Sequence, residues 1–367
     1  MSWRDWADVE AAAIRTAGRW REPRDLDAAG PEGKLAPDGR PVVSFASNDY
    51  LGLTQHPAVV AAAHGALDRW GTGAGSARLI VGSRPVHAEL EVALAGWKRS
   101  ERAVLFPTGF ATNLGVLTTF GGPGVLVCSD ELNHASIIDG CRASRSRVEV
   151  YRHGNLDHLA HLLATVPRER ALVVTDTVFS MDGDVAAIDA IATLCARHDA
   201  LLVLDEAHAV LGPDPELADV EALRVGTLSK TLGALGGFVA GPRRFTELVV
   251  NRARSYIFTT APSPADSAAA LAAVGVVRSD EGAGLRRRLR ANVERLRGGH
   301  PSPIVPVVLG DEARTLAAAE ALLDMGMLVP AIRPPTVPDG TSRLRVALSA
   351  AHTPSQVDGL AVALAAL

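Results

Sequence analysis

Short apolar runs that alternate with helix-like segments constrain the fold of this chain more than any other feature of its sequence. The runs are continuous and rich in Val and Leu, as strands are when both faces of a parallel sheet are covered. The segments between them, such as 188–199, have the composition of helices. This alternation predicts an α/β layered fold. The strand candidates are RAVLF (102–106), GVLVCS (124–129), ALVVTD (171–176), ALLVLD (200–205) and GGFVAG (236–241).

The length of 367 residues predicts two linked domains. We expect an N-terminal helix and arm over 1–40, a large α/β domain over 41–250 and a small α+β domain over 251–367. After residue 250 the pattern is largely helical, and two segments there, 302–310 and 342–349, have the pattern of strands.

The composition excludes several classes of protein. The formal net charge of −4 provides no basic surface for nucleic acid or a membrane. Three cysteines without a C-x-x-C argue against a disulfide framework or a zinc ribbon. The N-terminus is amphipathic and lacks the apolar core of a signal peptide, and no stretch approaches the roughly 18 apolar residues of a membrane span. We therefore expect a reduced, cytoplasmic protein.

Polar residues follow the predicted strands at the points where the strands end. Ligands of parallel α/β folds bind outside the carboxyl ends of the strands, so these residues are the site candidates. Each alone has an ordinary structural explanation, such as a histidine satisfied in the core or an aspartate that caps a helix. Together they place a lysine, acids, two histidines and phosphate donors at one edge of a sheet. The candidates are Gly109, His134, Asp176, Ser180, Asp205, His208, Thr227 and Lys230.

Three other kinds of site fit the sequence poorly. A P-loop needs a glycine directly before its lysine, and Ser229 stands there. A dinucleotide fingerprint needs three glycines between a strand and a helix, but GTGAGS has Ser76 at the last position. Asp205 and His208 are spaced to share a helical face, yet no third metal ligand is apparent.

A lysine beside an aspartate at a neighbouring strand end is what pyridoxal 5'-phosphate chemistry requires. Lys230 lies among small and apolar residues, VGTLSKTLGALGGFVAG, which disfavour its ammonium form and leave the amine able to attack an aldehyde. Asp205 would keep the pyridine nitrogen protonated so that the ring withdraws electrons. The cofactor phosphate would bind the helix start at Gly109 and the hydroxyls of Ser180 and Thr227.

The motifs around these residues resemble those of a known family, the α-oxoamine synthases, which are pyridoxal phosphate enzymes with the fold of aspartate aminotransferase. The resemblance covers nearly the whole chain from about residue 40. It implies a mostly parallel central sheet flanked by helices, with a smaller C-terminal α+β domain. The motifs that carry it are SFASNDYLGLTQHP, NHASIIDGCRAS, DTVFSMDGD, LDEAH, GTLSKTLGALGGF and RPPTVPDGTSRLRVALSAAHT.

The resemblance implies roles for individual residues. Lys230 would hold the cofactor covalently, Asp205 would pair with the pyridine nitrogen, and His208 would bind the phenolic oxygen. His134 would stack on the ring and assist catalysis. The remaining cofactor contacts would be Gly109, Phe110, Ser180, Thr227 and, across a homodimer interface, Thr259. The substrate contacts would be Arg345, on the amino acid carboxylate, with Asn48, Arg333, Thr336 and one N-terminal arginine, best matched by Arg19, with Arg21 and Arg24 as competitors.

The implied reaction is the decarboxylative condensation of an amino acid with an acyl thioester. The stretches VVRSDEG and IRPPTVPDGTSRLR favour the members that join L-alanine to a pimeloyl thioester, carried by CoA or by a carrier protein, in biotin biosynthesis. The alternatives are an α-oxoamine synthase of the aminolevulinate synthase or 2-amino-3-ketobutyrate ligase type, an aminotransferase, or a catalytically silent assembly partner.

One segment departs from the family pattern, and one run of charged residues has no role in that pattern. Ala209 replaces a glycine after the DEAH segment, and the loop that follows, which the resemblance implies to lie near the active-site mouth, is shortened. The run Arg286, Arg287, Arg288 and Arg290 is most simply the solvated face of a helix, with a site for an anion as the alternative.

Overall fold

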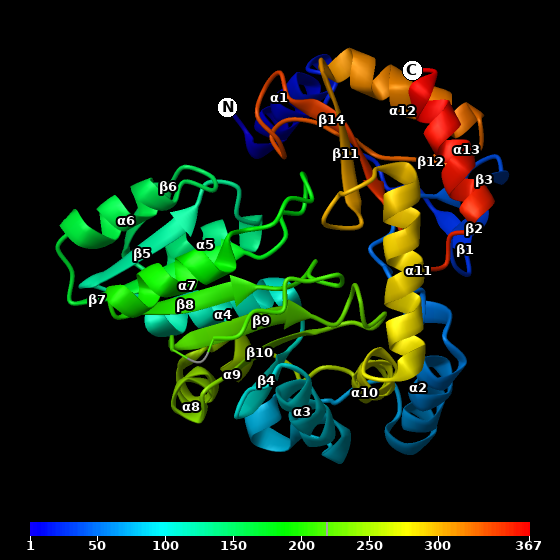
Figure 1. Cartoon of the computed structure of the whole chain (residues 1–367). Coiled ribbons are helices and arrows are strands. Elements are labelled where there is room, and N and C mark those ends of the chain that lie inside the picture. The colour runs from blue at the N-terminus through cyan, green and yellow to red at the C-terminus, as the bar shows by residue number, and fades with distance from the viewer. Residues whose placement is uncertain (218) are drawn as a thin grey trace.

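The computed structural model describes residues 1–217 and 219–367, and a seven-stranded mixed sheet forms its centre (Figure 1). The strand order is β4-β10-β9-β8-β7-β5-β6. Six strands run in one direction, and β10 is antiparallel to both of its neighbours. The bounds are β4 (Arg102–Phe106), β5 (Val125–Asp130), β6 (Arg147–Tyr151), β7 (Arg170–Asp176), β8 (Ala200–Asp205), β9 (Ala222–Thr227) and β10 (Gly237–Gly241).

The reversed strand β10 follows from the length of its connection. Residues 228–236 join β9 to β10, and this is fewer than the dozen or so residues that a parallel crossover needs. The chain therefore turns back on itself, and the turn that carries Lys230 lies just beyond the carboxyl end of β9. The five strand candidates are present within a residue or two, but β10 is not one of the parallel strands that its apolar composition suggested.

Two strands of the sheet were not among the candidates, and their residues explain why. β6 is one of the two edge strands and is mostly exposed or half-exposed, so its pattern RVEVY is not continuously apolar. In β9 the apolar run is interrupted by Arg224, which is nevertheless buried in an ion pair with Glu206. A buried charged residue whose ion-pair partner is distant in sequence interrupts the apolar pattern by which a buried strand is predicted.

Helices cover both faces of the central sheet. On one face, buried residues of β4, β5 and β7 pack with helices α4 (Gly109–Phe120), α5 (Ala135–Ala143) and α8 (Arg243–Arg252) and the turn α9 (Arg254–Ile257). On the other, α6 (Leu156–Thr165) and α7 (Ile188–Arg197) pack on β5, β7 and β8. A third cluster joins the sheet edge to α3 (Pro85–Trp97), α10 (Pro264–Val277) and the C-terminal part, while α2 (Pro57–Trp70) packs on α10.

The C-terminal part has its own three-stranded sheet, in the order β11-β14-β13. A four-stranded sheet, β1-β2-β3-β12, joins the N-terminal arm to it, since β3 pairs in parallel with β12. The predicted strands 302–310 and 342–349 are β11 and β14. The bounds are β1 (Leu26–Ala28), β2 (Glu32–Leu35), β3 (Arg40–Ser44), α11 (Asp280–Leu296), β11 (Ile304–Gly310), α12 (Glu312–Asp324), β12 (Met327–Leu328), β13 (Ala331–Ile332), β14 (Ser342–Ala347) and α13 (Pro354–Ala365). The domain limits themselves stay a prediction.

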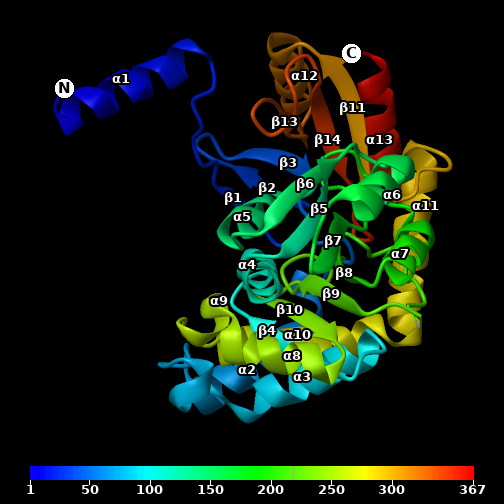
Figure 2. The ribbon, with the colours of Figure 1, turned by 90° about the vertical axis from the view of Figure 1, so that its left-hand side faces the viewer.

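The N-terminal helix α1 (Trp3–Thr16) buries none of its residues. Ser2 and Asp5 form a capping box at its start, which satisfies backbone donors of a helix that buries no side chain against the described residues. Figure 2 shows α1 projecting away from the rest of the molecule. Among the helices of the described residues, none combines the length and apolar character that crossing a membrane requires.

Candidate active site

Lys230 lies on the tight turn between β9 and β10, at the edge of the sheet where the parallel strands end. Gly233 has φ +62° in this turn, and a Cβ there would stand 2.6 Å from the amide nitrogen of Thr54, so glycine lets the turn pack closely on residues 53–54. The Lys230 Nζ lies 2.8 Å from Nε2 of His208. Burial lowers the pKa of Lys230, although the charges of Asp205 and Asp176 oppose the shift. The setting favours a reactive, neutral amine.

His208 connects Lys230 to a chain of hydrogen bonds. Its Nδ1 lies 2.5 Å from the hydroxyl of Tyr50, which donates to Asn48 Oδ1 over 3.0 Å, and Arg345 Nη2 donates to the same oxygen over 3.2 Å. Because the single Tyr50 proton goes to Asn48, His208 Nδ1 donates to Tyr50 and Nε2 accepts from Lys230. Burial, and then the charge of Lys230, hold the pKa of His208 well below its ordinary value, so the ring is neutral.

Asp205 and Asp176 end neighbouring strands and form a buried pair of carboxyl groups. Asn113 donates to Asp205 Oδ2 over 2.6 Å, and the amide of Ala207 donates to Oδ1 over 3.0 Å. Burial, and then the charge of Asp205, raise the pKa of Asp176 well above its ordinary value. Asp176 is therefore the carboxyl group of the pair that is more readily protonated, and the two N–H donors at Asp205 stabilise negative charge there.

His134 caps α5 and presents an exposed ring beside this pair. Its amide donates to Asp176 Oδ2 over 2.9 Å, and its Nδ1 lies 2.7 Å from the Ser136 hydroxyl. Asn113 Nδ2 also donates to Ser136, over 2.9 Å, so one network orients His134 and Asp205 together. Sequence reasoning missed Asn113, because a polar residue inside a helical stretch is usually solvated; its burial depends on the neighbouring helix.

The start of α4 and two hydroxyls form the anion-binding end of the site. Thr108 caps the helix, and a Cβ on Gly109 would stand 3.3 Å from the Thr227 Cβ, so glycine permits a close approach. The Thr227 and Ser229 hydroxyls lie 2.7 Å apart. The first amides of a helix have no intrahelical acceptor and favour phosphate. Phe110 follows, 45% exposed.

Arg345 and Arg343 project from one face of β14 to the loop 177–185 that follows β7. Arg345 Nε donates to the Ser180 carbonyl over 2.5 Å, and Arg343 pairs with Asp182. Ser180 thus contacts Arg345 through its backbone. Both arginines are buried. The ion pair with Asp182 was not anticipated from the sequence, since its partners are 161 positions apart.

His153 holds the other end of this loop. Its Nδ1 lies 2.9 Å from Asp130 Oδ1 and its Nε2 lies 2.8 Å from Asp184 Oδ2. Hydrogen bonds to the two carboxylates raise the pKa of His153 to about 10. The imidazolium therefore clamps β5 to the loop that carries Ser180.

This clamp makes a pH-dependent contribution to stability. Since the pKa of His153 rises from 6.5 to about 10 on folding, its contribution is complete below pH 6.5 and is lost as pH rises through 10. We expect His153→Gln to lower the free energy of unfolding by about 2 kcal/mol at pH 6 and by much less at pH 10.5. Urea unfolding at the two pH values measures this, with the exposed His161→Gln as control. An equal loss at both pH values would contradict it.

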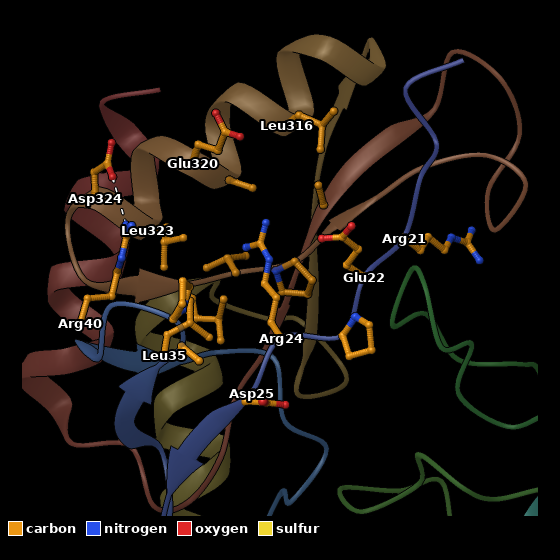
Figure 3. A pocket seen from close by; sticks show the side chains of 18 of the residues that line it. Arg21, Glu22, Arg24, Asp25, Leu35, Arg40, Leu316, Glu320, Leu323 and Asp324 are labelled. Carbon is orange, nitrogen blue, oxygen red and sulfur yellow. Dashed lines mark hydrogen bonds and ion pairs between the residues drawn. The ribbon is translucent and has the colours of Figure 1, made fainter. Parts of the chain in front are cut away.

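Several predicted substrate residues have contacts of their own that do not include Lys230. Arg19 pairs with Glu312 over 2.6 Å. Arg333 donates to the Gly18 carbonyl over 2.8 Å and borders a cavity of about 1160 Å³ between the N-terminal arm and α12. In this cavity Arg24 points inward and Arg21 points away (Figure 3). Thr336 lies in an exposed turn and Thr259 after α9, and among the described residues no hydrogen bond joins either to Lys230.

The residues gathered around Lys230 fit pyridoxal phosphate by their chemistry. An amine of lowered pKa, a buried carboxylate on the neighbouring strand and an anion-binding helix start are present at one sheet edge. Asn113 Oδ1 is buried without a hydrogen-bond partner in the described part of the chain, which is consistent with a site built around a further polar group.

Comparisons with known proteins agree with this geometry. The model of the family "Aminotransferase class I and II" matches residues 40–364. An 8-amino-7-oxononanoate synthase of Anaeromyxobacter dehalogenans is 49% identical over 381 residues, which cover 99% of this chain and 95% of that protein. A solved serine palmitoyltransferase variant of S. paucimobilis with a bound pyridoxal phosphate aldimine superposes with a TM-score of 0.90 at 30% identity, covering 99% and 96% of the two chains. The 8-amino-7-oxononanoate synthase of Francisella tularensis, at 23% identity, shares the fold with a TM-score of 0.73, covering 89% and 98%.

Proposed function

The chain belongs to the class I and II aminotransferase family, and within it the resemblance to the α-oxoamine synthases is confirmed; from this premise we propose that it condenses L-alanine with a pimeloyl thioester in biotin biosynthesis. The products would be 8-amino-7-oxononanoate, CO2 and the free thiol of CoA or of a carrier protein. The 49% identity to a relative of that name over nearly the whole chain supports this substrate pair. Its cofactor is pyridoxal 5'-phosphate.

The observation that carries the proposal is the contact of Lys230 with neutral His208 beside the carboxylate of Asp205. Bound pyridoxal phosphate supplies an aldehyde that captures amines and a ring that withdraws electrons from the bond to be broken. Lys230 Nζ would hold the cofactor and then take and return the proton at alanine Cα. Asp205 would hold a proton on the pyridine nitrogen. His134 would lie over the ring, and His208 would orient the phenolic oxygen.

Product identification tests the proposal against its alternatives. The enzyme is incubated with pimeloyl-CoA and with alanine, glycine or serine, and the products are identified by mass spectrometry. Alanine is expected to give 8-amino-7-oxononanoate with release of CO2. A product only from glycine or serine would indicate another α-oxoamine synthase, and a keto acid with aminated cofactor would indicate an aminotransferase.

Arg345 is the proposed ligand of the alanine carboxylate. Its bonds to Ser180 and Asn48 engage two of five N–H donors, which fixes the guanidinium and leaves donors for a bidentate pair. We expect Arg345→Ala to raise the KM for alanine about 10- to 100-fold with a smaller change in kcat. Steady-state kinetics at saturating thioester measures this. An unchanged KM for alanine would remove Arg345 from the role.

We also propose that Arg24 is the N-terminal arginine that contacts the acyl substrate. The cavity in Figure 3 combines apolar lining residues, such as Leu35 and Leu323, with Arg24 pointing into it. Arg19, the best match by sequence, is engaged by Glu312. We expect Arg24→Ala to raise the KM for pimeloyl-CoA about tenfold and Arg21→Ala to leave it unchanged. A larger effect from Arg19→Ala would restore Arg19 to this role.

We also propose a cytoplasmic homodimer. The exposed apolar residues of α1, including Trp3 and Trp6, and the exposed segment Leu79–Val81 offer surface for a second copy. Thr259 would then contact the cofactor phosphate of the neighbouring subunit. Light scattering on the holoenzyme is expected to give twice the 38.4 kDa chain mass. A fully active monomer would contradict the homodimer and the role of Thr259.

A further inference from the structure

A second cavity, of about 910 Å³, lies beside the segment that follows β8. Residues 209–214 of that segment form one wall, and the end of α10 and one face of α11 form another. We call it the arginine cavity, because the second wall carries Arg278, Arg286, Arg287 and Arg290. Its volume is within the range of small-molecule sites.

The other charged residues of the arginine cavity neutralise one another. Glu206 pairs with Lys98 over 2.7 Å and with Arg224 over 2.6 Å. Asp214 pairs with Arg224 over 2.6 Å and with Arg99 over 3.0 Å. These pairs leave no carboxylate free to compensate the second wall.

The four arginines of the second wall have no such partners. Glu281 and Arg295 of α11 form ion pairs with residues outside the cavity. Within residues 1–217 and 219–367, no ion pair involves any of the four arginines. Instead, Arg286 donates to the Val277 carbonyl over 2.8 Å and Arg290 to the His300 carbonyl over 3.0 Å. Neutral carbonyls orient these guanidiniums without cancelling their charge. Like charges three and four residues apart destabilise a helix, so the arrangement favours a bound anion.

The wall opposite the arginines is the shortened loop, and it adjoins the catalytic residues. His208 directs its ring to Lys230 and Tyr50, whereas the next residues, from Ala209 onward, line the cavity. Thr231, directly after Lys230, lines it as well. The cavity is therefore separate from the site of Lys230 but shares its supporting backbone.

From this geometry we propose that the arginine cavity is a binding site for a small molecule that carries a diphosphate or triphosphate. Guanidiniums bind phosphate oxygens in bidentate pairs and stay charged in partly buried settings. Four uncompensated guanidiniums match the charge of such a group. A concave site of this size, open to solvent on one side, suits a small ligand. The diphosphate can come from a free nucleotide or from the phosphate-bearing part of CoA.

Calorimetric titration of the holoenzyme with pyrophosphate, ADP and CoA, without amino acid, tests the site. Because no turnover is involved, the result is independent of the proposed reaction. Arg287 is exposed and makes no hydrogen bond within the described residues, so its replacement is not expected to disturb folding. We expect Arg287→Ala to weaken binding of pyrophosphate and ADP about tenfold and Arg287→Glu to weaken it further. Arg288→Glu, on the same helix but outside the lining, is the matched control and is expected to change little.

Comparing the affinities for the three ligands identifies which phosphate-bearing molecule the site binds. An equal loss of CoA affinity in Arg287→Glu would assign the site to the phosphates of CoA, and a loss confined to pyrophosphate and ADP would assign it to a free diphosphate. The proposal is overturned if the wild-type holoenzyme binds none of the three below millimolar concentrations. It is also overturned if Arg288→Glu weakens binding as much as Arg287→Glu.

Discussion

Replacing Lys230 by alanine is expected to abolish turnover, with kcat lowered at least about 10⁴-fold. The effect is this large because one amine has two tasks, covalent attachment of the cofactor and proton transfer at the amino acid Cα. The Nζ is 2.8 Å from His208 in a setting whose burial lowers the lysine pKa. A side chain without an amine can perform neither task, and neighbouring residues supply no substitute amine.

Activity and the visible absorbance of the purified protein together check this prediction. The bound cofactor is expected to lose the absorbance that covalent attachment to an amine produces. Lys34→Ala, on the exposed surface of β2, is the control and is expected to retain both activity and absorbance. Thermal unfolding shows whether the variants are folded. A folded Lys230→Ala protein with normal turnover would refute the assignment of the catalytic lysine.

The second large effect is expected from Asp205→Asn, with kcat lowered about 10²- to 10³-fold, as when one preorganised electrostatic contact is lost. The substitution preserves shape and removes the negative charge that would hold the pyridine nitrogen protonated. Asn113 can still donate to the remaining carbonyl oxygen, whereas the hydrogen bond from the Ala207 amide is lost together with the charge, and the packing is kept.

Asp176→Asn is the matched comparison, because Asp176 has the same burial and lies on the neighbouring strand. The raised pKa of Asp176 favours the neutral form of its carboxyl group, so we expect an amide in its place to change little. We expect less than about a tenfold effect on kcat, and the amide oxygen can still accept from the His134 amide. Equal losses in the two variants would contradict the division of charge between them.

Much of the fold was predictable because strand burial leaves a local signature. A sheet covered on both faces requires continuous apolar strands, and five of its seven strands have them. The direction of β10 was also open to prediction, since nine residues cannot form a parallel crossover, but composition alone does not reveal it. The apolar pattern does not predict β9, because Arg224 interrupts it. Glu206, which compensates the charge of Arg224, lies at the end of the neighbouring strand.

The candidate site also has a part that the sequence predicts and a part that it does not. Residues directly after strands, such as Asp205 and Lys230, are brought together by a rule of parallel sheets. The hydrogen bonds that set their protonation are not local in sequence. Asn113 comes from α4, and Tyr50 comes from a segment 158 positions before His208. Their function depends on which helices and loops pack over the sheet edge.

The sequence by itself determined the chemistry: a lysine in apolar surroundings, carboxylates and histidines at strand ends, and motifs of the α-oxoamine synthases. Only the tertiary structure decided which groups are charged. Burial beside Asp205 raises the pKa of Asp176, and burial beside Lys230 lowers the pKa of His208. The sequence predicted a solvated helix face for the run that includes Arg286, Arg287 and Arg290, and only the structure places these three with Arg278 along one cavity. Electrostatic energy depends on distance and on exclusion of water, and both are set when distant segments pack.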